Sequence, residues 1–187
     1  MKTKLITLFA STLISGTALA APLTFDFKDP KGVNNAVFKL DAPLEAINGS
    51  ANGISGTVLF DPANPAATKG KIVVAADSLT VPNSMMQGHL HSPMWLDTAK
   101  HKEISFEAKE LKNVKTAGDK TTADAHGTLT IKGVAKAVST PITLTYLKGK
   151  LGTRLNKPDL KGDLLVIRAN FTVKRSDYGI NPGAGEE

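Results

Sequence analysis

Residues 83–101, NSMMQGHLHSPMWLDTAKH, contain three of the four histidines, three of the four methionines and the only tryptophan of the chain. Imidazole and thioether groups are ligands of soft transition metals such as copper. His89 and His91 are two residues apart, which places them about 200° apart on a helix but on one face of a strand. Gly88 and Pro93 flank the pair, and no third ligand stands at a recognised metal-site spacing. The pattern therefore favours histidines on a loop surface and methionines that fill an apolar opening.

The same stretch is a weak candidate for catalysis. Ser78, Ser84 and Ser92 lie near His89 in the sequence, but the chain has no Gly-x-Ser-x-Gly element to present a nucleophile. Asp97 is the only carboxylate between residues 83 and 101. The chain has no cysteine, which excludes thiol catalysis, thiolate metal sites and haem attachment through cysteine. The sequence predicts a protein that is not an enzyme and that needs no metal or cofactor.

The elements that hold this stretch begin after an export signal. Residues 1–20 carry two early lysines, the apolar run Leu5–Ile14 and a small-x-small ending at Ala20, which together predict a Sec signal peptide. The apolar run is shorter than the roughly 20 residues that a membrane span requires. Residues 21–187 are then expected to form one domain, soluble in a bacterial periplasm.

Apolar and polar side chains alternate through residues 104–111, 127–134, 141–149 and 164–175. A period of two is typical of strands with one buried face. Further strands are predicted at residues 23–27, 36–41, 47–54, 56–61 and 71–76. Short turn-rich segments such as DPANP and TAGDK separate them and leave no room for parallel crossovers, so the sheet is expected to be antiparallel. About eight strands, with one or two short helical turns within residues 84–99, predict a sandwich or a barrel.

The charge of the chain gives no reason to expect a nucleic-acid partner. The formal charge is +6, and removing Lys2 and Lys4 with the signal leaves +4. The cations are mostly lysines, and they form neither a dense run nor a series interleaved with aromatic residues.

Three motifs follow one another along the mature chain. The first is ADSLTVPNSMMQGHL with WLD and KHKEISFEAKEL, including Ser78, Asn83, His89–Leu90, Trp95–Asp97 and Glu103–Phe106; the second is GTLTIKGVAKAVSTPITL, and the third is KRSDYGI. In this order they resemble the YceI family of exported lipocalin-like proteins, and the match spans nearly all of the mature chain. The resemblance implies an all-β, eight-stranded antiparallel barrel that holds a polyisoprenoid, such as a quinone tail or a polyprenyl lipid.

A lipid cavity of this kind is physically reasonable. A strand of about eight residues is roughly 26 Å long, enough for several extended isoprene units. Each buried methylene contributes about 0.8 kcal/mol, so a few units reach the roughly 8 kcal/mol of a micromolar complex. The strand faces alone fit a barrel filled by its own side chains equally well; the resemblance favours the cavity.

On this interpretation residues 83–101 form the lid and mouth of the barrel. Asn83 and His89 are expected to fix the lid by hydrogen bonds, and Arg175 with Asp177 to tie the last strand to it by a charge-assisted pair. The expected ligand-binding residues are Met85, Met86, His89, Met94, Trp95, Ile104, Phe106, Leu129, Ile131, Ile142, Leu144, Ile167 and Phe171.

Two alternatives stay open at this point. One is a periplasmic metal-binding or stress-response protein that uses His89, His91, Met85 and Met86. The other, less favoured, is a hydrolase of small lipids. Transient membrane contact and a homodimer are also left open by the sequence.

Overall fold

The computed structural model describes residues 21–29, 31–42 and 45–181, so the predicted signal peptide and the last six residues lie outside the described part. The strands are β1 (Leu23–Asp26), β2 (Ala36–Ala42), β3 (Glu45–Ala51), β4 (Ile54–Phe60), β5 (Lys69–Ala75), β6 (Glu103–Ala117), β7 (Lys120–Ile131), β8 (Val134–Leu147) and β9 (Leu164–Ala169). The helices are α1 (Ser84–His91) and α2 (Leu151–Leu155), with single 3₁₀ turns at Pro65–Ala67, Ala76–Ser78 and Ser176–Tyr178. None of the helices in these ranges is long and apolar enough to cross a bilayer.

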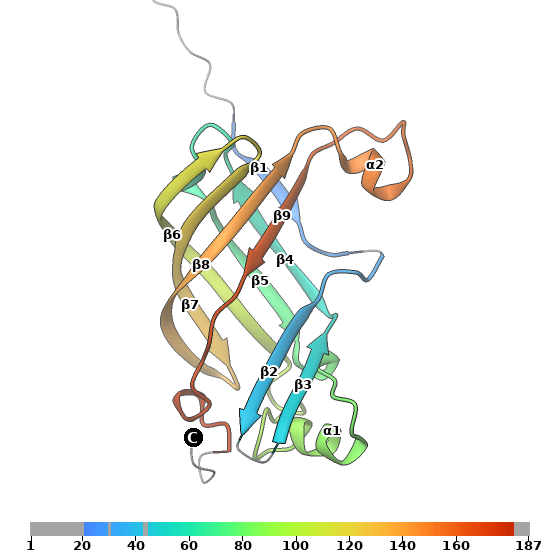
Figure 1. The fold of residues 1–187 in the computed structure, drawn as a ribbon, viewed down its shortest axis with the longest axis vertical. Helices are drawn as coiled ribbons and strands as arrows, with labels where there is room; N and C mark the ends of the chain where they lie inside the picture. The colour runs from blue at the N-terminus through green and yellow to red at the C-terminus, as the bar shows by residue number, and fades with distance from the viewer. Residues whose placement is uncertain (1–20, 30, 43–44, 182–187) are drawn as a thin grey trace, which may run out of the picture.

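Seven strands form one antiparallel sheet in the order β1-β4-β5-β6-β7-β8-β9, which curls into a nearly closed barrel (Figure 1). β2 and β3 pair with each other as a separate hairpin beside the barrel. Two hydrogen bonds join the hairpin to the segment that precedes α1. The Ser50 amide donates to the Thr80 carbonyl (3.0 Å), and the Thr80 amide donates to the Ser50 carbonyl (2.7 Å). The predicted all-β antiparallel barrel is confirmed. The barrel sheet has seven described strands, where the resemblance implied eight, because β2 and β3 pair with each other and form a second sheet.

Two predicted strands are divided or shortened in the structure. The segment 47–54 breaks before Ile54, where Gly53 lies against β5 and the 3₁₀ turn after it: its carbonyl accepts from the Ala75 amide at 2.8 Å, and its amide donates to Ser78 Oγ at 3.1 Å. A side chain at Gly53 would come within 2.7 Å of the Ala75 side chain. The segment 164–175 stops being a strand at Ala169, whose partner Ile142 adjoins Pro141. Proline has no amide hydrogen to donate to a neighbouring strand, so the ladder between β8 and β9 ends beside Pro141.

The barrel interior contains two hydrophobic clusters rather than one. The first lies at the α1 end and contains Leu79, Leu96, Leu129, Ile131 and Tyr178 among its buried members. The second contains Val58, Phe60, Leu111, Leu144 and Leu165, with Ala123 and Ala125. Phe106 packs against both clusters.

Candidate functional site

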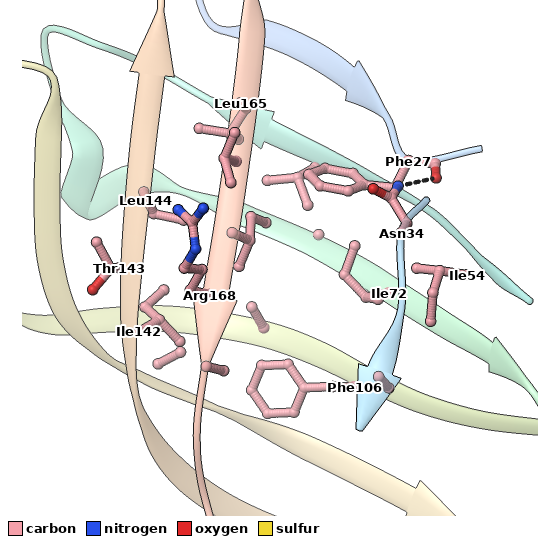
Figure 2. A pocket seen from close by; sticks show the side chains of 18 of the residues that line it. Phe27, Asn34, Ile54, Ile72, Phe106, Ile142, Thr143, Leu144, Leu165 and Arg168 are labelled. Carbon is pink, nitrogen blue, oxygen red and sulfur yellow. Dashed lines mark hydrogen bonds between the residues drawn. The ribbon is translucent and has the colours of Figure 1, made fainter. Parts of the chain in front are cut away.

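A cavity of about 2190 Å³ occupies the barrel between and around these clusters. Pockets for drug-sized ligands are roughly 300–1,000 Å³, so this space suits a larger guest. Figure 2 shows Ile72, Phe106 and Ile142 extending from β5, β6 and β8 around a common space. The apolar lining side chains include Phe25, Phe27, Ile54, Val58, Ile72, Val74, Ile104, Phe106, Leu111, Leu129, Ile131, Ile142, Leu144, Leu165 and Ile167.

Small residues on β7 explain why the barrel is not filled. The buried positions of this strand follow every second residue from Thr121 to Ile131, and three consecutive ones are Ala123, Ala125 and Gly127. Inward residues of a small barrel normally fill its interior. Ala123 and Ala125, which carry only a methyl group, line the cavity and leave the middle of the barrel open, while Leu129 and Ile131 close its α1 end.

The ring of Phe106 lies next to Gly127. Phe106 pairs with Leu129 across the β6–β7 ladder, and a Cβ added to Gly127 would come within 2.8 Å of the Phe106 ring and 2.2 Å of the Glu107 carbonyl. The glycine therefore lets the ring lie close to β7, between the two clusters.

The wall of the cavity continues from β7 into β8 and β9. In their ladder Leu144 pairs with Ile167 and Ile142 pairs with Ala169. Ile142, Leu144, Leu165 and Ile167 all belong to the second cluster or pack against it. The alternation seen in the sequence therefore directs the expected residues inward on both strands.

The strands that border one side of the cavity do not pair with each other, and we call this unpaired line the seam. In the described part of the chain β9 pairs only with β8, β1 only with β4 and β2 only with β3, apart from the Ser50–Thr80 bridge of β3. Lining side chains beside the seam are exposed, at 76% for Val37, 48% for Phe171 and 37% for Val173. The cavity therefore reaches solvent between β9, with the residues that follow it, and the chain from β1 to β2.

The loop between β1 and β2 is fixed by the carboxylate of Asp29. Its two oxygens accept from the amides of Val33 (2.7 Å), Asn34 (2.8 Å) and Lys31 (2.9 Å). Burial acts to raise the pKa of Asp29, but the hydrogen bonds from Asn34, Lys31 and Val33 and the charge of Arg154 outweigh it and hold that pKa below its usual value. The side chain of Asn34 donates through Nδ2 to the Phe27 carbonyl at 3.2 Å, on the cavity side of the loop (Figure 2).

A second carboxylate joins the ends of β8 and β9. Tyr146 Oη donates to Asp163 Oδ2 at 2.5 Å, and the Gly149 amide donates to Asp163 Oδ1 at 2.7 Å. The hydrogen bond to Asp163, with burial and the charge of that carboxylate, raises the pKa of Tyr146 to about 12. The bond from Tyr146, with the Gly149 amide and the charge of Lys148, outweighs burial and lowers the pKa of Asp163.

The sequence-predicted site residues separate into two groups in space. Eight line the cavity: Ile104, Phe106, Leu129, Ile131, Ile142, Leu144, Ile167 and Phe171. Five lie outside its lining: Met85, Met86, His89, Met94 and Trp95. Those five belong to α1 and the turn after it, at the end of the barrel next to the β2–β3 hairpin (Figure 1). Met85 and Met94 are largely exposed there.

The helical turns predicted in residues 84–99 are present as α1, and the predicted role of Asn83 is confirmed. Asn83 Oδ1 accepts from the Met86 amide at 3.0 Å and caps the helix. The residues that fasten the helix to the preceding chain were not the ones expected. The Leu79 carbonyl accepts from Gln87 Nε2 at 2.9 Å and from His91 Nε2 at 2.8 Å, while His89 is exposed.

The C-terminal segment contacts the turn after α1, with Arg175 taking part as expected, but through contacts other than the charge-assisted pair with Asp177 that the sequence suggested. The guanidinium carbon of Arg175 lies 5.4 Å from the centre of the Trp95 ring. The Asn181 amide donates to the Met94 carbonyl at 2.9 Å. Lys132 Nζ donates to the carbonyls of Met94 (3.2 Å) and Gly179 (2.9 Å).

Within the described ranges no group of three or more His, Asp or Glu residues is placed to hold a metal ion. Sequence reasoning missed Ala123 and Ala125, which leave the space open, Gly127, which accommodates the Phe106 ring, and Tyr146 with Asp163, which join the wall. The signal for the small residues was present, since TADAHG places one at every second position immediately before and into the strand predicted at residues 127–134. Tyr146 and Asp163 are 17 residues apart, and no local pattern connects them.

The model of the YceI-like domain family matches residues 21–186. A UPF0312 protein of Yersinia pestis (strain Pestoides F) is 30% identical over 183 residues, which are 96% of this chain and 86% of that protein. A UPF0312 protein of Pseudomonas paraeruginosa is 33% identical over 137 residues, which are 73% of this chain and 65% of that longer relative. Among solved structures, the YCEI protein of Campylobacter jejuni matches with a TM-score of 0.46 and 18% identity, covering 78% of this chain and 98% of that one.

Proposed function

The chain belongs to the YceI-like domain family, and from that premise we propose that it is a periplasmic carrier that holds an isoprenoid lipid inside its barrel. The observation that supports this most is the 2190 Å³ cavity lined by branched aliphatic and phenyl side chains. The ligand class, a polyprenyl or quinone-type chain, comes from the resemblance of the three sequence motifs. The periplasmic location comes from the signal-like residues 1–20.

The chemistry of the lining suits a slender, methyl-branched chain. Transfer of apolar surface from water is worth roughly 25 cal/mol per Å², and it needs no directed polar partner. Several cations at the rim, among them Lys28, Lys39 and Arg168, are exposed, so their charges stay in contact with water. A polar head group at the seam would remain solvated while the apolar tail is buried.

The proposed mechanism is passive burial without covalent chemistry. The hydroxyls that line the cavity, such as Ser105 and Thr143, have no histidine beside them in the lining. Nucleophilic catalysis requires a base within hydrogen-bond reach of the hydroxyl. The lining therefore favours a binding protein over a lipid hydrolase.

The direct test is mass spectrometry of solvent extracts from protein purified from a bacterial periplasm. An isoprenoid in stoichiometric amount is expected. Ala125→Phe places a ring in the open middle of β7 and should reduce the bound lipid severalfold. Thr128→Phe is the matched control, because Thr128 alternates to the other face of β7 and does not line the cavity. Extracts without any apolar compound, together with a protein that takes up no added polyprenol, would contradict the proposal.

A further inference from the structure

The chain between β8 and β9, residues 148–163, forms a compact body that we call the basic projection. Figure 1 shows its helix α2 standing out from the barrel wall. Its sequence, KGKLGTRLNKPDLKGD, has five basic and two acidic residues, a formal charge of +3 in a chain whose total is +6. The basic residues are Lys148, Lys150, Arg154, Lys157 and Lys161. Half of the formal charge of the chain is therefore concentrated in 16 residues that the fold brings together.

Internal bonds give the basic projection a defined shape. The Lys157 amide donates to the Gly152 carbonyl at 2.8 Å, the Leu160 amide to the Lys157 carbonyl at 3.0 Å and the Leu151 amide to the Gly162 carbonyl at 3.1 Å. Gly152 is buried, and a side chain there would come within 2.5 Å of the Leu160 carbonyl. The body is also anchored at its base by the Tyr146–Asp163 hydrogen bond.

The basic projection is part of the mouth of the cavity. Leu151, Arg154 and Leu155 line the cavity from this side. The loop between β1 and β2 joins it across the seam, since Lys31 Nζ donates to the Arg154 carbonyl at 2.6 Å. A surface that contacts the basic projection would therefore adjoin the opening of the barrel.

The exposed side chains combine free positive charge with apolar groups. In the part of the chain that the structure covers, Lys150, Lys157 and Lys161 are exposed and form no salt bridge. Leu160 beside them is 40% exposed, and Val33, on the loop held by Lys31, is 52% exposed. Basic residues around exposed aliphatic groups are complementary to a bilayer with anionic head groups, where the charges meet phosphates and the apolar groups enter the interface.

We infer that the basic projection docks the protein on anionic phospholipid bilayers, with the mouth of the cavity facing the lipid. The exchange of an isoprenoid between bilayer and cavity rests on the proposed function; the docking itself does not. A nucleic acid fits this surface less well, because residues 148–163 contain no aromatic residue for base stacking and only one arginine.

Docking is tested by sedimentation of the full mature chain with vesicles. We expect binding to vesicles of equal parts phosphatidylcholine and phosphatidylglycerol, no binding to phosphatidylcholine alone, and loss of binding in high salt. Each lysine near an anionic surface raises the affinity about fivefold. The triple variant K150Q/K157Q/K161Q should therefore bind about 100-fold more weakly.

The matched control is K71Q/K109Q/K136Q, which removes the same charge from exposed positions on β5, β6 and β8. It should stay within a few-fold of wild type. Equal losses in the two triple variants would overturn the inference, because attraction would then depend on net charge alone. Absence of binding to the anionic vesicles would also overturn it, and would leave an acidic protein as the partner to seek.

The two proposals fail separately. None of the six lysines lines the cavity, so both triple variants should take up a polyprenol delivered in detergent as wild type does. Normal uptake without vesicle binding would refute docking and keep the carrier. Vesicle binding without uptake of any isoprenoid would refute the carrier and keep docking.

Discussion

Phe106 occupies the position where the two interior clusters meet. An aspartate there would place a charge among Ile72, Leu129 and the other aliphatic groups of the lining, which is costly to desolvate. Phe106→Asp should abolish isoprenoid binding, and Phe106→Leu should bind nearly as wild type does. Titration with a polyprenol, followed by calorimetry, measures both. Circular dichroism verifies that each variant is folded, and Ile142→Asp replaces Phe106→Asp if the latter does not fold.

The same change at Phe171 should have a smaller effect than at Phe106. Phe171 follows the end of β9 and is 48% exposed, so a charge there can remain in water at the seam. We expect Phe171→Asp to weaken binding by less than Phe106→Asp in the same titration. Equal losses would show that the ligand covers the seam completely.

We expect no tight stoichiometric site for copper or zinc at α1. His89 and His91 lie on α1 two residues apart, which separates the rings by about 200° around the helix axis. Calorimetry on wild type and on H89A/H91A should give the same weak heats. A submicromolar site that disappears in the double variant would instead favour the metal-binding alternative.

At the scale of the element, Gln87 is expected to stabilise the attachment of α1. Its side chain accepts from the Val81 amide at 2.8 Å and donates to the Leu79 carbonyl at 2.9 Å, so it joins the helix to the chain that precedes it. Gln87→Ala should cost about 1–3 kcal/mol in urea denaturation, because it removes two bonds to backbone groups. His89→Ala is the control on the same helix and should change the free energy of unfolding by less than about 0.5 kcal/mol.

The junction of β8 with the basic projection should be sensitive to pH. The pKa of Asp163 is lowered below 3.8, so the stabilisation by its bond to Tyr146 is present above that pH and is lost as the pH falls through the folded-state value. The pKa of Tyr146 is raised from 10.0 to about 12, so the bond is also lost as the pH rises toward about 12.

Tyr146→Phe tests this junction. Between pH 5 and pH 9 it should lower Tm by about 2–4 °C, the effect of one hydrogen bond of about 1 kcal/mol in a chain of this size. Thermal scans at acid pH should bring the two melting curves together, because the wild-type bond is then lost as well. A difference that persists undiminished under strong acid would assign the effect to packing of the ring instead.

For the whole molecule, the bound lipid is expected to be part of its stability. A ligand that binds only the folded state at 100 times its Kd adds about 2.7 kcal/mol, which for this length raises Tm by roughly 5–10 °C. Delipidated protein should therefore melt lower and recover when an isoprenoid is restored. Saturated fatty acid of similar length serves as the comparison for chain specificity. Identical melting with and without bound isoprenoid would argue against the carrier.

The sequence by itself determined the class of the fold and which way most strand residues face. Alternation over residues such as 127–134 and 164–169 is a local property, because successive side chains of a strand point to opposite sides wherever the strand lies. The turns and the cap of α1 by Asn83 are local for the same reason: their partners lie within a few residues. Eight of the thirteen expected ligand-binding residues accordingly line the cavity.

The tertiary structure decided whether the barrel is filled or hollow, because that depends on which residues face one another across the sheet. Ala123 and Ala125 leave space only because the closing of the sheet brings no longer side chain from another strand to fill it. It also decided that the residues of α1 lie beside the hairpin, away from the cavity, since no local pattern places a helix at one end of a barrel. The seam and the basic projection depend on pairing that is absent and on contacts between residues over a hundred positions apart, such as Lys31 with Arg154. Such contacts form when the chain closes on itself, so local sequence carries no signal for them.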